Sequence, residues 1–267
     1  MLTKLGKSSS PQYPANSFSK SPLSSLGKAT TMSTAELNPS KLGTKEHWDG
    51  VYERELENFE EIGDEGEVWF GEDSVEKMVD WCIDNVPVSS NPAVLEIGSG
   101  NGTLLFGLLE AGYDSTRLAG IDYSAGAVKL AQGIAATKDG EAIAFTECDF
   151  LNDTPAPLPS DSSSDGLEYW DLLLDKGTYD AIALGDKDEE GRSPAAGYPS
   201  RIPRLLKPGG LFLITSCNFT ADELKASFTA AETGLVYHSQ VRHPTFTFGG
   251  QSGSVVTTVA FQKPQVA

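Results

Sequence analysis

The stretch Ala93-Val94-Leu95-Glu96-Ile97-Gly98-Ser99-Gly100-Asn101-Gly102 decides the fold of this 267-residue chain. Its first five residues form a short, mostly apolar run ended by glycines, which predicts a buried strand. Thr103–Ala111 follows with a helical pattern. A glycine-rich turn between a strand and a helix lets a ligand approach the backbone closely, and it presents the unpaired N–H groups of the helix to that ligand.

Strand and helix patterns alternate from Ala93 onward. Further strands are expected at Leu118–Ile121, Ile143–Cys148, Asp171–Leu174 and Leu211–Ser216, and further helices at Ala125–Ala136, Pro199–Leu206 and Ala221–Ala231. The late strands Leu235–Val241 and Val255–Gln262 have no helical pattern between them, and the glycines in their connection suit an antiparallel hairpin. The predicted fold class is α/β, with a Rossmann-like, doubly wound, seven-stranded, mostly parallel sheet and a C-terminal antiparallel hairpin.

The spacing of Gly98, Gly100 and Gly102 carries information about the ligand. A dinucleotide fingerprint requires G-x-G-x-x-G, but position 103 is threonine, so the third glycine comes one place early. Asp122 ends the second expected strand, where a carboxylate accepts hydrogen bonds from the two vicinal hydroxyls of a ribose. The pattern predicts a ribose-bearing cofactor and favours S-adenosylmethionine over a dinucleotide. A solvated aspartate at a strand end is the alternative interpretation of Asp122.

Aspartates also follow the third and fourth expected strands. Asp149 is a candidate acceptor for an adenine amino group, with Phe150 or Tyr123 beside the ring, although an ordinary loop aspartate fits its position equally well. Asp175 lies at the carboxyl edge, where doubly wound sheets place their ligands. It is a candidate to contact an incoming ammonium or the methionine part of the cofactor. Alternatively, it caps the helix that begins near Tyr179.

The composition limits the remaining possibilities. The net charge of −18 opposes broad electrostatic binding to nucleic acid and favours basic partners. The chain has no apolar run long enough to span a membrane. Its three cysteines are far apart and it has three histidines, so we expect no disulfide framework and no metal site. A reducing, intracellular compartment is the simpler interpretation.

Residues 1–40 differ from the rest of the chain. They are rich in Ser, Pro and Thr, and they have no acidic residue before Glu36, so a disordered tail is expected. A targeting peptide is the alternative, but the segment lacks arginine and an apolar core. Residues 41–267 are expected to form one domain. Its acidic, aromatic N-terminal segment, residues 41–90, would cover substrate and cofactor, with a helix at Ser74–Val86.

Several further segments complete the pattern. They are Leu42–Asp49, Gly66–Gly71, Gly120–Ser124, Asp175–Ile182, Ile214–Asn218 and Phe246–Gly253. With the glycine segment, they make Leu42–Lys263 resemble the seven-strand, class I protein-lysine methyltransferases that act on translation elongation factor 1-alpha. Most methyltransferases of this fold share the glycines and Asp122. The segments Trp69-Phe70-Gly71 and Phe248-Gly249-Gly250 are much narrower and carry the assignment.

The resemblance implies transfer of methyl groups from S-adenosylmethionine to a lysine ε-amine of elongation factor 1-alpha, a basic protein, in the cytoplasm. We expect a monomer, with no metal ion and no nucleic-acid or membrane partner. Asp175 is the expected catalytic residue. The expected cofactor contacts are Trp69, Glu96, Gly98, Gly100, Gly102, Asp122, Tyr123, Asp149 and Phe150.

Aromatic residues are candidates for an apolar channel that holds the lysine stem by cation–π contact and lowers the pKa of its amine. They are Trp48, Tyr52, Trp69, Phe70 and Tyr179, with ordinary core packing as the alternative. Three other functions remain open. A small-molecule methyltransferase would need a closing lid, and the glycine spacing and a missing Tyr-x-x-x-Lys motif oppose a nicotinamide oxidoreductase. The third is a non-catalytic module that binds the cofactor or a partner protein.

Overall fold

Seven strands form one sheet in the described part of the chain, in the order β3-β2-β1-β4-β5-β9-β6. Their bounds are β1 Val94–Ile97, β2 Leu118–Asp122, β3 Ala144–Glu147, β4 Trp170–Lys176, β5 Leu206–Ser216, β6 Val236–Val241 and β9 Thr257–Gln262. Neighbouring strands from β3 to β5 are parallel, and β9 is antiparallel to both β5 and β6. This doubly wound, mostly parallel sheet with one reversed strand confirms the predicted fold class.

The computed structural model describes residues 37–159, 167–244, 246–248 and 251–265, without the side chains of 246–248 and 251–253. Most of the expected tail and residues 160–166 lie outside the described residues. Within the last four residues of that tail, Leu37 packs against the core and the Ser40 N–H donates to the Leu184 carbonyl at 3.0 Å. Among the described helices, none has the length and apolarity to cross a membrane.

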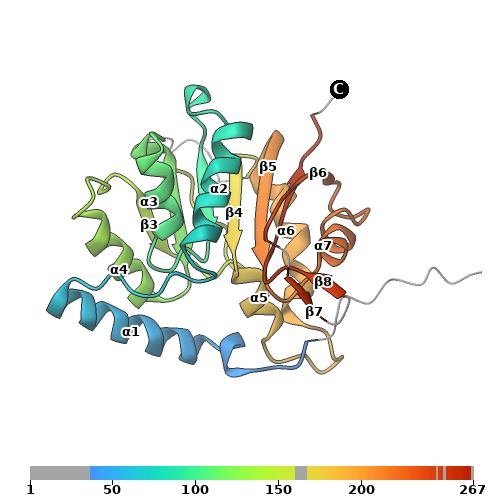
Figure 1. Ribbon diagram of the computed structural model, residues 1–267, viewed down its shortest axis with the longest axis horizontal. Helices are drawn as coiled ribbons and strands as arrows, with labels where there is room; N and C mark the ends of the chain where they lie inside the picture. Colours follow the sequence, from blue (N-terminus) through green and yellow to red (C-terminus); the bar gives the residue numbers. More distant parts are fainter. Residues whose placement is uncertain (1–36, 160–166, 245, 249–250, 266–267) are drawn as a thin grey trace, which may run out of the picture. The chain divides into compact units, whose positions relative to one another are not determined.

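Helices cover both faces of the sheet, as Figure 1 shows. One face carries α2 (Glu72–Asn85), α3 (Thr103–Glu110) and α4 (Ala125–Ala135), and the other carries α5 (Thr178–Ala183), α6 (Tyr198–Leu205) and α7 (Ala221–Phe228). Side chains alternate between the two cores along each strand. In β5, Leu211 and Leu213 pack in the core on the α2–α4 side of the sheet, whereas Phe212 and Ile214 pack in the core on the α5–α7 side. Burial on both faces explains the near-continuous apolar strand sequences.

The C-terminal hairpin is confirmed by the antiparallel pairing of β6 with β9. Its connection contains a separate two-stranded ribbon, formed by β7 (Phe246–Phe248) and β8 (Gln251–Gly253). The strand expected at Leu211–Ser216 begins earlier, at Leu206, because the preceding residues continue along β4 with a register shift.

Helix α1 (Lys45–Ile62) lies in a segment for which the sequence predicted no secondary structure. The Thr44 side chain caps its start by accepting from the His47 N–H, and Gly63, with φ 75°, ends it. Trp48, Tyr52 and Phe59 recur at helical spacing along one face. The periodic signal was therefore present, although many acidic residues surround it.

Two glycines of α4 allow α1 to pack closely against it. A Cβ on Gly126 would lie 3.2 Å from the Tyr52 Cβ, and one on Gly133 would lie 2.9 Å from the Phe59 ring. Both pairs advance by seven residues, so the two helices run in the same direction along this contact. Figure 1 shows α1 lying beside α4 and extending towards α5.

Replacing the Phe228 side chain tests the core on the α5–α7 side of the sheet. Its side chain is fully buried, with its ring centroid 5.1 Å from that of Phe212 and 5.3 Å from that of Phe261. Phe228→Ala is expected to lower the free energy of unfolding by about 3–5 kcal/mol, because it leaves a cavity. Urea denaturation measures the change. The control Val255→Ala, at a side chain that is 71% exposed, should stay within about 0.5 kcal/mol of the parent. Equal losses would contradict this account of the core.

Candidate active site

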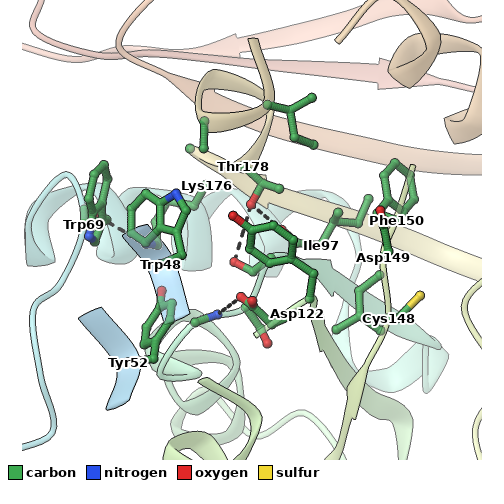
Figure 2. A pocket seen from close by; sticks show the side chains of 18 of the residues that line it. Trp48, Tyr52, Trp69, Ile97, Asp122, Cys148, Asp149, Phe150, Lys176 and Thr178 are labelled. Atoms are coloured by element: carbon green, nitrogen blue, oxygen red, sulfur yellow. Dashed lines mark hydrogen bonds between the residues drawn. The ribbon is translucent and has the colours of Figure 1, made fainter. Parts of the chain in front are cut away.

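A cavity of about 230 Å³ lies at the carboxyl ends of β1, β2 and β4 and beside the segment that follows β3. It is lined by Gly98–Asn101, Asp122–Tyr123, Cys148–Leu151 and Lys176–Thr178, and by Trp48, Tyr52 and Trp69 from the N-terminal segment. Figure 2 shows Trp48 and Trp69 at one end, Phe150 and Cys148 at the other, and Asp122 between them. This is the edge at which doubly wound sheets bind ligands.

The glycine segment forms one wall of the cavity. Gly98 and Gly100 have φ values of 66° and 53°, a backbone region that glycine adopts readily and other residues rarely adopt. A Cβ on Gly98 would lie 2.0 Å from the Thr178 Oγ1, and one on Gly100 would lie 2.5 Å from the Tyr52 hydroxyl. Gly102 does not line the cavity. It immediately precedes α3 as its N-cap residue, and a Cβ there would meet the rings of Phe106 and Phe145.

Asp122 connects this wall to the end of β2. Its Oδ2 accepts from the Gly100 N–H at 3.0 Å, and its Oδ1 accepts from the Ser124 N–H at 2.9 Å. Each oxygen keeps a second lone pair, so two acceptor positions remain for a ligand. Burial raises the pKa of the Asp122 carboxyl to about 6. The carboxyl is therefore mainly ionised at neutral pH, even though Asp122 is buried and only 6% exposed.

The residues expected around the adenine all line the cavity. Asp149 and Phe150 lie at the end opposite Trp69, as Figure 2 shows, whereas the Tyr123 hydroxyl donates to the Thr44 carbonyl at 3.4 Å. The Asp149 carboxylate accepts from the Leu151 N–H at 3.0 Å and from the Asn152 side chain at 2.7 Å, which fixes the turn after β3. Phe150 is buried, so its ring forms an apolar surface at this end.

Two predicted site residues, Glu96 and Asp175, do not line the cavity. Asp175 is fully buried, and its carboxylate accepts from the N–H groups of Thr178 and Tyr179, at 2.9 and 3.0 Å, and from the Tyr198 hydroxyl. These contacts correspond to the helix-capping alternative. The catalytic contact expected for Asp175 therefore receives no support from the geometry, and burial raises its pKa to about 7.

Glu96 lies buried beneath the glycine wall. Its Oε2 has no hydrogen-bond partner among the described residues, and burial raises its pKa to about 8, opposed by the attraction of Lys176. Glu96 therefore supports the glycine wall from below and does not line the cavity. In the part of the chain that the structure describes, no cluster of three or more His, Cys, Asp or Glu side chains could hold a metal ion.

Aromatic side chains of the N-terminal segment close the end of the cavity opposite Phe150. The Trp48 ring lies 4.7 Å from that of Trp69 and 6.1 Å from that of Tyr52, between centroids, and the Trp48 indole donates to the Leu42 carbonyl at 2.7 Å. Tyr179, which was expected in a channel, instead packs in the core, 4.9 Å from Phe219. Phe70 does not line the cavity either.

Asn101 and Lys176 tie the N-terminal segment to the sheet, a role that the sequence did not predict. The Asn101 amide donates to the Glu65 carbonyl at 2.9 Å, and the Lys176 ammonium donates to the Trp69 carbonyl at 3.2 Å. Asn101 stands inside the glycine turn, a local signal that could have identified it. Lys176 had no comparable signal, because its partner is distant in sequence.

The fold, the glycine wall and the position of Asp122 define a class I methyltransferase, and residues 88–261 match the methyltransferase domain family. The chain is 43% identical over 240 residues to protein-lysine N-methyltransferase efm4 of Schizosaccharomyces pombe, covering 85% of this chain and 95% of that protein. It is 40% identical over 226 residues to EEF1A lysine methyltransferase 2 of Homo sapiens, covering 84% and 88%.

The chain belongs to this family of protein-lysine N-methyltransferases, as its motifs indicated. It is an enzyme, and its methyl donor is S-adenosylmethionine.

Solved structures support the fold. The [4+2]-cyclase SpnF superposes with a TM-score of 0.57 at 13% identity, covering 86% of this chain and 98% of that chain. The N-methyltransferase NodS from Bradyrhizobium japonicum, in complex with S-adenosyl-L-homocysteine, gives 0.51 at 19% identity, covering 82% and 99%. A cyclase among these neighbours shows that the fold by itself does not determine the reaction.

Alanine at Gly98 tests the wall of the cavity. The new Cβ would clash with Thr178, whose hydroxyl donates to the Ile97 carbonyl at 2.8 Å, and alanine resists the positive φ. Gly98→Ala is expected to lower the free energy of unfolding by about 1–3 kcal/mol. Gly50→Ala, in α1 with nothing within 4 Å of the added Cβ, should instead raise it by up to about 1 kcal/mol. Urea denaturation compares them, and a neutral Gly98→Ala would contradict the close approach.

Proposed function

We propose that this enzyme methylates a lysine ε-amine of translation elongation factor 1-alpha. The observation that carries the proposal is the high identity, over most of the chain, with proteins named for lysine methylation of EEF1A in fish, mouse and human. Those matches cover about as much of this chain as the fungal protein-lysine methyltransferases do.

We assign three parts of S-adenosylmethionine to three parts of the cavity. Asp149, Phe150 and Tyr123 would hold the adenine at one end. Asp122 would accept from the ribose hydroxyls through its two remaining lone pairs, beside Gly98 and Gly100. Trp69 bounds the opposite end, with Glu96 and Gly102 supporting the wall from outside the cavity. When bound, the cofactor supplies a methyl group already activated on a sulfonium.

The residues of the chain mainly align and desolvate the acceptor. A lysine amine has an ordinary pKa of about 10.4 and must be neutral to attack. Trp48, Tyr52 and Trp69 line the end of the cavity beyond the ribose position, and their apolar rings disfavour the charged form of an entering amine. The same rings can hold the stem of the lysine side chain while it is aligned.

Charge supports a basic protein substrate. Helix α1, which contributes Trp48 and Tyr52 to the cavity, exposes five acidic side chains, namely Glu46, Glu53, Glu57, Glu60 and Glu61. With a net charge of −18, the enzyme attracts basic surfaces and steers them towards this edge. The cytoplasmic location, the monomeric state and the absence of nucleic-acid and membrane partners stay predictions, as do the domain boundaries at residues 40 and 90.

Asp122→Asn tests the ribose contact. Loss of the negative charge weakens the hydrogen bonds to both hydroxyls, so the Kd for S-adenosylhomocysteine, measured by calorimetry, should rise by about tenfold or more. Affinity of the parent should also fall as the pH drops through about 6, because protonation removes the acceptor form of the carboxylate.

The matched control is Asp114→Asn, an exposed aspartate that caps a short 3-10 helix away from the cavity. Its affinity should equal that of the parent at each pH. Asp122→Asn should also lose most of the decline in affinity below about pH 6. Parent-like affinity and pH dependence in Asp122→Asn would remove Asp122 from the cofactor site.

Incubation with labelled S-adenosylmethionine tests the substrate. Elongation factor 1-alpha should acquire label on a lysine, located by mass spectrometry, and replacing that lysine with arginine should abolish the label. A mixture of small amines provides the comparison. Label found in small molecules but not in the protein would favour the small-molecule methyltransferase, and binding without any transfer would favour the non-catalytic module.

A further inference from the structure

We propose that Lys176 is a positioning residue, whose ammonium holds the Val68–Gly71 turn and thereby sets Trp69 as a wall of the acceptor end of the cavity. The inference rests on the proposed function only for the identity of the acceptor. It assigns Lys176 no contact with the cofactor or with the reacting atoms.

The turn has an unfavourable backbone conformation. The Gly71 N–H donates to the Val68 carbonyl at 2.9 Å, which closes a four-residue turn with Phe70 in its third place. Phe70 has a φ of 64°. Turns with a positive φ at this place normally carry glycine or asparagine there. A bulky residue adopts such a conformation where its surroundings enforce it, and such residues cluster at functional sites.

Three contacts enforce the turn. The Lys176 ammonium donates to the Trp69 carbonyl at 3.2 Å, in the middle of the turn. The Phe70 ring lies over Gly177, where a Cβ would be 3.0 Å from the ring. The Trp69 ring packs against Trp48 of α1. Lys176 is the one polar side chain among these contacts, and it joins the turn directly to the end of β4.

The surroundings of Lys176 keep its ammonium in place. Its side chain and Glu96 lie on the same face of the sheet, one on β4 and one on β1. Burial lowers the pKa of Lys176, whereas attraction to Glu96 and Asp175 favours its charged form. Glu96 has an oxygen without a hydrogen-bond partner in the described residues, so the attraction to Lys176 compensates its burial in part.

The position of the turn restricts its effect to one end of the cavity. Trp69 and Lys176 line the end that also holds Trp48, whereas Phe150 and Asp149 line the opposite end, as Figure 2 shows. Releasing the turn should therefore disturb the acceptor more than the adenosine part of the cofactor.

The experiment compares Lys176→Met, Lys176→Arg and a control, Lys207→Met, whose ammonium pairs with Asp171 at 2.9 Å outside the cavity. The first readout is hydrogen–deuterium exchange of the peptide that contains residues 65–71, without substrate. The second is the Kd for S-adenosylhomocysteine. The third is KM and kcat for the protein substrate.

Lys176→Met should speed exchange in that peptide by about tenfold and raise the KM for the protein by about tenfold, because the turn opens more often. The Kd for S-adenosylhomocysteine should change by less than about threefold. Lys176→Arg should restore most of the slow exchange and the low KM, because arginine still donates to the Trp69 carbonyl. Lys207→Met should match the parent in all three measurements.

Unchanged exchange in Lys176→Met would overturn the proposal, and so would an equal loss of cofactor and substrate affinity, which would make Lys176 a cofactor ligand. If Lys176→Met fails to fold, the double variant Glu96→Gln/Lys176→Met removes both buried charges and gives the same test. The exchange measurement uses no acceptor. It therefore decides the role of Lys176 even if elongation factor 1-alpha is not the substrate.

Discussion

The backbone at Gly98 turns into a space where no side chain fits, and the rest of the site depends on that constraint. Because a Cβ would overlap Thr178, the turn after β1 and the start of α5 approach each other closely enough for the Thr178 hydroxyl to bind the Ile97 carbonyl. Asp122 then fixes the glycine segment from the neighbouring strand while keeping acceptor positions for a ligand. One carboxylate therefore both shapes the wall of the cavity and faces into it.

Local patterns were sufficient for most of the fold. Strands β1, β2 and β4 are buried on both faces, so each appears as a short apolar run whatever it packs against. Helix α1 escaped prediction because its contact with α4 depends on Gly126 and Gly133, which lie more than sixty residues away in sequence. Its acidic outer face also hides the spacing of Trp48, Tyr52 and Phe59.

The site was predictable where backbone geometry determines it, and less so where side-chain direction does. Position at a strand end places Asp175 and Lys176 at the same edge, but adjacent residues of a strand point to opposite faces. Leu173 and Asp175 face the α5–α7 side, and Leu172, Leu174 and Lys176 face the other side. Asp175 was predicted to be the catalytic residue at this edge, but its neighbour Lys176 lines the cavity instead.

The walls of the cavity come from two parts of the chain, one inside and one before the range that matches the methyltransferase domain family. The glycine segment, Asp122 and Phe150 fall within residues 88–261, which match the methyltransferase domain family, whereas Trp48, Tyr52 and Trp69 precede that range. Helix α1 docks on α4 at Gly126 and Gly133, so the acceptor end of the cavity depends on this helix contact as well as on the sheet. Substitutions along the α1–α4 contact should therefore shift Trp48 and Tyr52 while leaving the hydrogen bonds of Asp122 in place.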